Sequence, residues 1–299
     1  MIDRELLAQV RRIQVRTNRM VTDVMSGGYV SVFRGSGIEF DEVREFAEGD
    51  DVRSVDWNVT ARTGRPHIKK YMEERELTVM FLVDLSASTG FGTTAGRRGV
   101  RTVRETAAEF CACLALAAAR NNDKAGMIAF TDRIERYVPA KKGSSHVLRL
   151  IREALAFEPE GSGTDMVAAL DYAARVQRKR AVVFVVSDFL TEGYERSLGL
   201  LARRHDVVAA RITDPVTATP PRAGLVHLRD LESGRASWVD TSYQPFRDGY
   251  AERVAAMRGS LDEVCNKAGV DVLELSPDRS VADPIVQFFR MRELRGSHR

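Results

Sequence analysis

TVMFLVDLSAS, at residues 78–88, is the stretch from which the fold of this chain can be argued. Its first part, Val79–Val83, is a continuous apolar run, too short to span a membrane and typical of a strand buried on both faces of a parallel sheet. Asp84, Ser86 and Ser88 follow at the carboxyl end of that strand. Residues two apart point the same way in extended backbone, so these three side chains are expected to face one point.

A carboxylate and two hydroxyls at this spacing are suited to a hard cation. Mg²⁺ prefers near-octahedral oxygen coordination at about 2.0–2.1 Å and keeps several of its waters. The motif therefore predicts part of a divalent-cation site at Asp84, Ser86 and Ser88. The alternative is that one of the serines caps a following helix, because Ser is a frequent N-cap residue.

Length and composition set limits on the kind of protein. The 299 residues suggest one large domain with additions, or two domains, and a net charge of +3 with 29% charged residues does not imply nucleic acid as a partner. The odd number of cysteines and the apolar helical setting of Cys111 and Cys113 predict buried thiols in a reducing compartment. A charged amino terminus and no apolar run of about 18 residues predict a cytoplasmic protein without a membrane span.

Strand and helix patterns alternate through residues 77–214, which is typical of an α/β fold. We expect a three-layer, doubly wound and mainly parallel sheet with helices on both faces. The strands are expected at 79–83, 124–130, 181–186 and 206–212, and the helices at 103–121, 144–157, 166–178 and 194–205. Ligands of such sheets bind beyond the carboxyl ends of the strands, where the winding direction reverses.

Two further segments bring oxygen atoms toward the same end of the sheet. Asp188 follows the wholly apolar strand 181–186, so its strand and the one before Asp84 are predicted to be central neighbours. Thr164 lies in the loop GSGTD, residues 161–165, where it would either cap the next helix or bind a ligand. Two carboxylates about 4 Å apart repel by about 4 kcal/mol at an effective dielectric near 20, and a divalent cation removes that repulsion. The predicted metal ligands are Asp84, Ser86, Ser88, Thr164 and Asp188.

The flanking regions are predicted to be smaller additions. Residues 1–76 should hold a helix over Ile2–Val24 and a small appendage of short strands and turns, with Trp57 packed beneath it. Residues 215–299 should form a C-terminal region packed on the main domain. Its expected elements are a hairpin of 225–229 and 237–240 turning at 232–235, a helix over 250–268, a strand over 270–275 and a last helix over 284–294.

The five predicted ligands resemble the metal-ion-dependent adhesion site of von Willebrand factor A domains, and the resemblance covers roughly Leu77–Asp214. It implies a von Willebrand factor A-like fold and a bound divalent cation, Mg²⁺ first, with Mn²⁺ or Ca²⁺ as alternatives. It also implies an open coordination position, whose natural occupant is a Glu or Asp side chain of another protein.

Residues 32–76, which include RSVDW and TARTG, resemble the signature of domain-of-unknown-function family 58. Its bacterial members join such a segment to a von Willebrand factor A-like domain. The resemblance implies a MoxR-type AAA+ ATPase as partner, because members are commonly encoded beside these ATPases and are thought to act as their adaptors. Many longer members are membrane-anchored, whereas this sequence shows no anchor. The resemblance does not say what the Arg53–Trp57 and Thr60–Gly64 segments do.

Two classes of function follow from these features. The first is a binding module, not an enzyme, that acts with the ATPase in chaperone-like assembly or activation of a client protein. The alternative is a Mg²⁺-dependent phosphatase or other hydrolase with Asp84 as nucleophile. Haloacid-dehalogenase-type phosphatases generally carry a second acid where this chain has Ser86. Arg97, Arg98, Arg101 and Arg104 form a basic cluster that is either solvated or steers an acidic partner.

Overall fold

Two compact units make up this chain. One unit is Phe33–Leu77, and the other combines Met1–Val32 with Thr78–Arg299. The computed structural model describes residues 13, 15–17, 20–26, 29, 39–47, 50–51, 55–72, 76–90, 101–232 and 234–297. Most of the predicted helix at residues 2–24 lies outside these residues, although residues 20–26 are helical.

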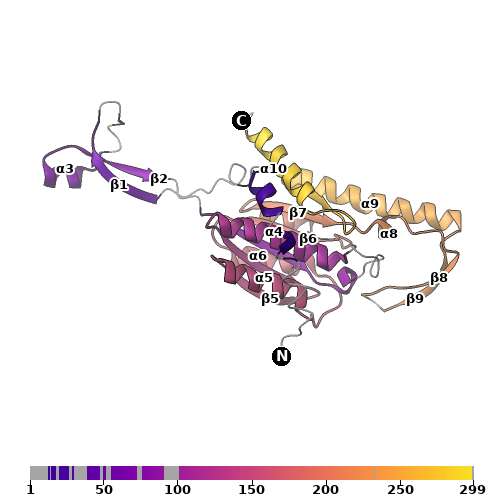
Figure 1. The fold of residues 1–299 in the computed structure, drawn as a ribbon. Helices are drawn as coiled ribbons and strands as arrows, with labels where there is room; N and C mark the ends of the chain where they lie inside the picture. The colour runs from indigo at the N-terminus through magenta and orange to yellow at the C-terminus, as the bar shows by residue number, and fades with distance from the viewer. Residues whose placement is uncertain are drawn as a thin grey trace. The chain divides into compact units, whose positions relative to one another are not determined.

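A six-stranded sheet forms the centre of the larger unit (Figure 1). Its strand order is β10 (Asp271–Leu275), β7 (Asp206–Ile212), β6 (Val182–Ser187), β3 (Thr78–Asp84), β4 (Lys124–Phe130) and β5 (Ile134–Lys141). Every neighbouring pair is parallel except β4 and β5, which are antiparallel. The predicted fold class, a doubly wound and mainly parallel α/β sheet, is confirmed.

Helices cover both faces of this sheet. They are α4 (Val103–Arg120), α5 (Ser144–Ala156), α6 (Met166–Val176), α7 (Glu195–Ala202), α9 (Gln244–Ala268) and α10 (Ala282–Ser297). Met80 and Leu82 of β3 belong to a buried cluster with residues of α6, α7 and α9. Phe81 points to the other face, where Phe184 stacks on it at 5.8 Å and meets Phe110 of α4 edge-on. This alternation explains why β3 is apolar without a break: both of its faces are covered.

The winding direction reverses between β3 and β6. From β3 the chain passes through α4 to β4 on one side, whereas β6 pairs with the other side of β3 and leads through α7 to β7. The register pairs Val83 with Val186, so the carboxyl ends of both strands lie at the same edge. The prediction that these two strands are central neighbours is confirmed, and their ends form the switch point where α/β sheets bind ligands.

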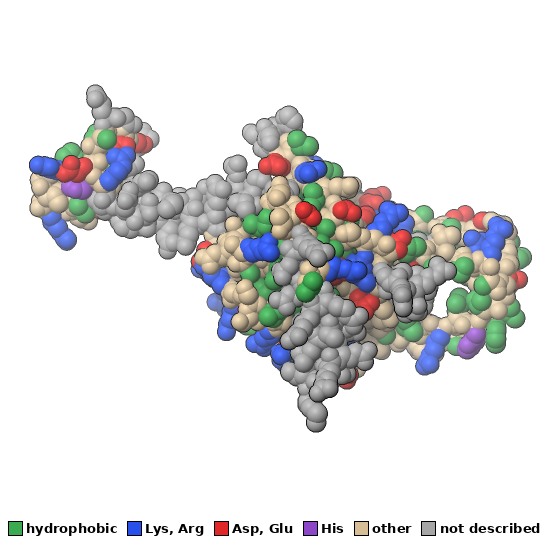
Figure 2. Space-filling model, in the orientation of Figure 1, with side chains coloured by type: hydrophobic (Ala, Val, Ile, Leu, Met, Phe, Trp, Pro, Cys, Tyr) green, Lys and Arg blue, Asp and Glu red, His purple; other side chains and the backbone are tan. Residues whose placement is uncertain are grey.

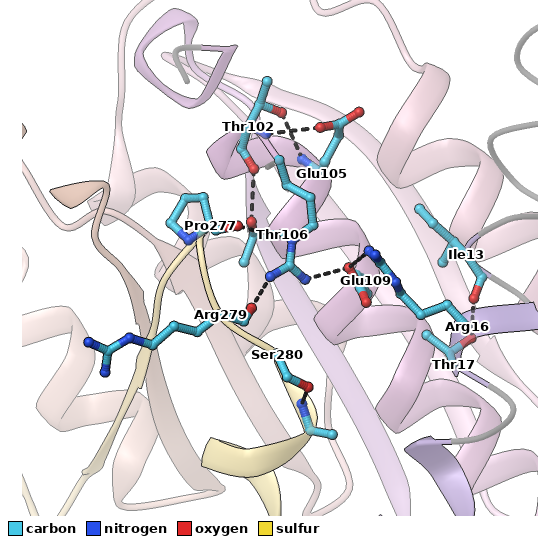
Figure 3. A network of polar contacts seen from close by, with 12 residues as sticks. Ile13, Arg16, Thr17, Thr102, Glu105, Thr106, Glu109, Pro277, Arg279 and Ser280 are labelled. Atoms are coloured by element: carbon cyan, nitrogen blue, oxygen red, sulfur yellow. Dashed lines mark hydrogen bonds and ion pairs between the residues drawn. The ribbon is translucent and has the colours of Figure 1, made fainter. Parts of the chain in front are cut away.

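Arg101 ties the start of α4 to the C-terminal region, and its partners Glu109, Pro277 and Arg279 are labelled in Figure 3. Its guanidinium donates to Glu109 Oε2 at 2.5 Å, to the carbonyl oxygen of Pro277 at 3.2 Å and to that of Arg279. Arg104 similarly donates to backbone carbonyls between α5 and the following loop. The prediction that these arginines belong to a solvated or steering cluster is therefore wrong for both. The N–H groups of Arg101 and Arg104 bind a buried carboxylate and backbone carbonyl oxygens in place of solvent. Arg97 and Arg98 lie outside the described residues.

The C-terminal region adds one strand to the sheet and one separate hairpin. β10 extends the sheet beside β7, so this part of the chain completes the central layer. After the short helix α8 (Pro215–Ala218), strands β8 (Leu225–Arg229) and β9 (Ala236–Asp240) pair only with each other within the described chain. Most residues of both strands are exposed. No helix among the described residues has the length and apolar character needed to cross a membrane. The three cysteines are free and buried.

The unit Phe33–Leu77 contains an antiparallel pair, β1 (Glu39–Glu45) and β2 (His67–Met72), with helix α3 (Trp57–Thr63) between them. Asp56 caps α3, because its carboxylate accepts from the backbone N–H groups of Asn58 and Val59. The prediction that Trp57 packs beneath this unit is wrong, since its side chain is 69% exposed. Trp57 is the first residue of a helix in which no residue is buried.

Candidate metal centre

Asp84 is held by hydrogen bonds at the carboxyl end of β3. It is 1% exposed, and both of its carboxylate oxygens are occupied. Oδ1 accepts a hydrogen bond from the backbone N–H of Ser86 at 2.9 Å, and Oδ2 accepts one from Ser187 Oγ at 2.7 Å. Ser187 is the residue after Val186, which pairs with Val83, so the strand register brings this hydroxyl near the carboxylate.

Two serine hydroxyls link the β3 loop to the end of β6. Ser86 Oγ lies 3.0 Å from Ser88 Oγ, and Ser88 Oγ donates to Asp188 Oδ2 at 3.0 Å. The chain between them turns in a short 3-10 segment, Ala87–Gly90, stabilised by Thr89 bonding back to the carbonyl oxygen of Ser86. The hydroxyl of Ser86 is therefore directed toward Ser88, and the hydroxyl of Ser88 lies between Ser86 and Asp188.

Asp188 is positioned by a strained turn. Phe189, the next residue, has φ = 56°, a left-handed conformation that is uncommon for residues other than glycine. This turn brings the backbone N–H of Leu190 to Asp188 Oδ1 at 3.1 Å, and the N–H of Phe189 to Ser187 Oγ at 3.0 Å. Strain of this kind concentrates at functional sites, where the surrounding structure enforces it.

The loop Gly161–Asp165 lies against the β3 loop, because the backbone N–H of Ala87 donates to the carbonyl oxygen of Ser162 at 2.9 Å. Thr164 does not cap helix α6: Asp165 is the capping residue and accepts from the N–H of Ala168 at 2.8 Å. The Thr164 hydroxyl instead donates to Glu232 Oε1 at 2.9 Å. The structure thus links Asp84, Ser86, Ser88 and Asp188 through hydrogen bonds and adds Thr164 through a neighbouring loop, and their role as ligands stays a prediction.

The electrostatics of the two aspartates are unfavourable without a cation. Burial raises the pKa of Asp84, and the nearby charge of Asp188 raises it further. Burial also raises the pKa of Asp188, partly offset by the hydrogen bonds from Leu190 and Ser88. Among the described residues, no basic side chain forms an ion pair with either aspartate. The buried Asp84 and the half-buried Asp188, at the ends of neighbouring strands, therefore lack a positive charge that a divalent cation would supply.

The donor set fits a hard cation better than a metal that prefers thiolate or imidazole ligands. The described residues contain no group of three or more His, Cys, Asp or Glu side chains placed to hold a metal. Of the five predicted ligands only Asp84 and Asp188 are carboxylates, and the other three offer hydroxyl groups. Oxygen-only coordination of this kind suits Mg²⁺, Mn²⁺ or Ca²⁺.

Two residues of this site did not emerge from the sequence. Ser187 precedes Asp188. A residue-by-residue alignment of β3 with β6 would have placed its hydroxyl near Asp84. Glu232 lies in the predicted hairpin turn, and nothing in the sequence indicates that this turn reaches Thr164. Burial raises the pKa of Glu232, the hydrogen bond from Thr164 lowers it, and the negative charge of Asp188 raises it.

Comparison with known proteins gives a family and several relatives. A model of the family described as "Protein of unknown function DUF58" matches residues 42–260. Uncharacterized protein Mb1516 of Mycobacterium bovis is 31% identical over 97% of this chain and 90% of its own length, and Uncharacterized protein Rv1480 of Mycobacterium tuberculosis matches to the same extent. Among solved structures, the conserved hypothetical protein BatB from Bacteroides thetaiotaomicron is 16% identical, with a TM-score of 0.43 over 75% of this chain and 100% of that one.

Proposed function

The chain belongs to the DUF58 family, and we propose that it is a protein-binding module whose capture of a partner requires a divalent cation. One observation carries this proposal. Asp84 and Asp188 lie at the switch point of the sheet and are linked through Ser86 and Ser88, with no basic side chain of the described chain in an ion pair with either. A cation there would remove the carboxylate repulsion and present an electrophilic centre at the molecular surface.

Asp84, Ser86, Ser88, Thr164 and Asp188 are the residues proposed to hold the cation, directly or through water. Mg²⁺ is the first candidate and Mn²⁺ or Ca²⁺ the alternatives, because all donors are hard oxygens. When bound, the cation supplies a position that accepts a carboxylate oxygen from a second protein. The chain's own contribution is orientation, since Ser86, Ser187 and Leu190 fix the aspartates before any partner arrives.

The partner proposed from the family resemblance is a MoxR-type AAA+ ATPase, together with a client protein that offers a Glu or Asp side chain. In this scheme the ATPase supplies mechanical work, and this chain is an adaptor in assembly or activation of the client rather than an enzyme. A single electrophilic contact is directional and is removed by chelator. Such a contact suits an adaptor that must bind and release.

Capture assays on the full chain test this function. Wild-type protein immobilised with Mg²⁺ is expected to retain the MoxR-type ATPase or a client and to release it in excess chelator. Asp84→Ala and Ser86→Ala should abolish capture while far-ultraviolet circular dichroism stays unchanged. A matched control is Glu252→Gln, which changes an exposed acid on α9. Capture that persists in excess chelator would refute the proposal.

The hydrolase alternative is less well supported by the geometry of Asp84. A nucleophilic carboxylate must reach the substrate directly, whereas Asp84 is 1% exposed and a cation can be held through water. A colorimetric phosphatase screen with Mg²⁺ distinguishes the two functions. Turnover that is lost in Asp84→Ala would favour the hydrolase.

A further inference from the structure

The tip of the β8–β9 hairpin contacts the proposed cation site. Thr164 Oγ1 donates to Glu232 Oε1 at 2.9 Å, and Ser162 Oγ donates to the backbone carbonyl of Glu232 at 3.4 Å. The charge of Asp188 and the hydroxyl of Ser88 both lie near enough to affect the Glu232 carboxylate. An acidic side chain of this chain therefore lies where an acidic side chain of a partner would have to approach.

The hairpin is an arm held at its base. There Thr241 Oγ1 donates to the carbonyl oxygen of Gly224 at 3.0 Å, and Arg247 of α9 donates to the carbonyl oxygens of Pro220 at 2.7 Å and Thr241 at 3.3 Å. Its strands are mostly exposed, and Figure 2 shows apolar side chains over the hairpin and an opening between it and the rest of the unit. Since the strands are not packed into the core, burial does not dictate where the tip lies.

The turn at the tip is ordered by its own bonds. Asp230 Oδ1 accepts from the N–H of Glu232 at 2.9 Å, and the backbone of Asp230 pairs with Arg235 and Gly234. This turn presents the Glu232 side chain outward from the end of the arm, toward Thr164. The polar contact with the loop Gly161–Asp165 is therefore made by a preformed turn carrying a single carboxylate.

We propose that Glu232 is an in-chain ligand of the cation, an inference that rests on the proposed function. Its carboxylate takes the coordination position that a Glu or Asp of a partner would take. A tethered ligand acts at an effective concentration in the millimolar range, so a partner must displace the hairpin to bind. The hairpin thereby sets a minimum affinity that a partner needs for capture, and carboxylates that bind the cation weakly are excluded.

The test uses the full chain and Mn²⁺ alone as probe. Wild type, Glu232→Gln, Glu232→Ala and the control Glu252→Gln are titrated by calorimetry, and water proton relaxation is measured on bound Mn²⁺. Loss of a ligand should weaken Mn²⁺ binding about tenfold in both Glu232 variants. It should also raise the relaxation enhancement, because a water replaces the carboxylate. Unchanged affinity and relaxation in both variants would overturn the inference.

A second measurement separates this inference from the proposed function. Asp84→Ala should abolish Mn²⁺ binding, and Mn²⁺ should slow hydrogen exchange of the hairpin turn in wild type but not in Glu232→Ala. If Asp84→Ala abolishes binding while the Glu232 variants behave as wild type, only the in-chain ligand is wrong. If wild type does not bind Mn²⁺, the cation site and the in-chain ligand both fail.

Discussion

A substitution at Asp188 can measure the repulsion between the two carboxylates while the surrounding hydrogen bonds are kept. Its oxygens accept from Ser88 and Leu190, and an Asn keeps the acceptor for Leu190. The Ser88 hydroxyl can rotate to accept from the new amide. The substitution therefore removes a negative charge beside Asp84 and keeps the hydrogen bonds.

The effect of Asp188→Asn on the free energy of unfolding should change sign between chelator and saturating Mg²⁺. In chelator, its free energy of unfolding should equal or exceed that of wild type, because the repulsion with Asp84 is gone. With Mg²⁺ at one hundred times its Kd, wild type should gain about 2.7 kcal/mol and the variant should gain little. Urea unfolding in both conditions measures this. Equal stabilisation of both proteins by Mg²⁺ would contradict the ligand assignment, and Glu252→Gln is the control.

His205 gives a pH dependence that is independent of the cation. It is 3% exposed, and burial lowers its pKa, with the positive charges of Arg204 and Arg180 lowering it further. The unfolded state therefore binds more protons just below the ordinary His pKa of about 6.5, so stability falls as pH drops through that value toward the folded pKa. In chelator, His205→Leu should lose less stability than wild type between about pH 7 and pH 5. If the free energies of unfolding of the two proteins, measured in urea, fall equally with pH, His205 is not the cause of the loss.

At the scale of elements, the sequence predicted the strands of the central sheet well because they are buried on both faces. Lys124–Phe130 and Asp206–Ile212 match their predicted ranges, whereas α9 begins at Gln244, earlier than the predicted Tyr250. Pro245 is tolerated in the first turn of a helix, where its missing N–H has no partner, so proline there does not mark a loop.

The sequence placed the strand-end residues of the site but not the contacts between separate loops. Asp84 and Asp188 follow from the rule that ligands bind at carboxyl strand ends. The bond from Thr164 to Glu232 depends on the direction in which a hairpin leaves the domain, and no local pattern encodes that direction. The pairing of Arg101 with buried Glu109 was missed for the same reason, since an arginine cluster is usually solvated.

Gly161 tests whether the loop must approach closely for the site to form. A Cβ at Gly161 would lie 2.1 Å from Asp132 Oδ1 and 2.3 Å from Thr131 Oγ1, whereas a Cβ at Gly163 would meet its nearest neighbour at an ordinary 3.7 Å. Thr131 and the N–H of Gly161 both donate to Glu135, so a shift breaks these bonds. Gly161→Ala should lower the free energy of unfolding by about 1–3 kcal/mol and weaken Mn²⁺ binding in calorimetry. Gly163→Ala should change neither quantity. If the two substitutions have equal effects, the close approach at Gly161 is not what the site requires.

At the scale of the whole molecule, every residue of the proposed site belongs to one unit. The β3 loop, the glycine loop, the end of β6 and the hairpin tip are all parts of Thr78–Arg299. The unit Phe33–Leu77 supplies no predicted ligand. With 45 residues between these bounds, this unit is near the size at which a single core becomes marginal. A cation that binds only the larger unit can stabilise the smaller one only if their unfolding is coupled.

Hydrogen exchange of the full chain should therefore divide along the two units. At Mg²⁺ one hundred times its Kd, amides of β3, β6 and β7 that exchange only when the larger unit unfolds should slow by about a hundredfold. Amides of β1, β2 and α3 should keep their rates, because no ligand comes from their unit. Asp84→Ala should remove the slowing in the sheet and leave the small unit unchanged. Slowing of both units by the same factor would mean that they unfold together, and the cation would then act on the chain as one cooperative body.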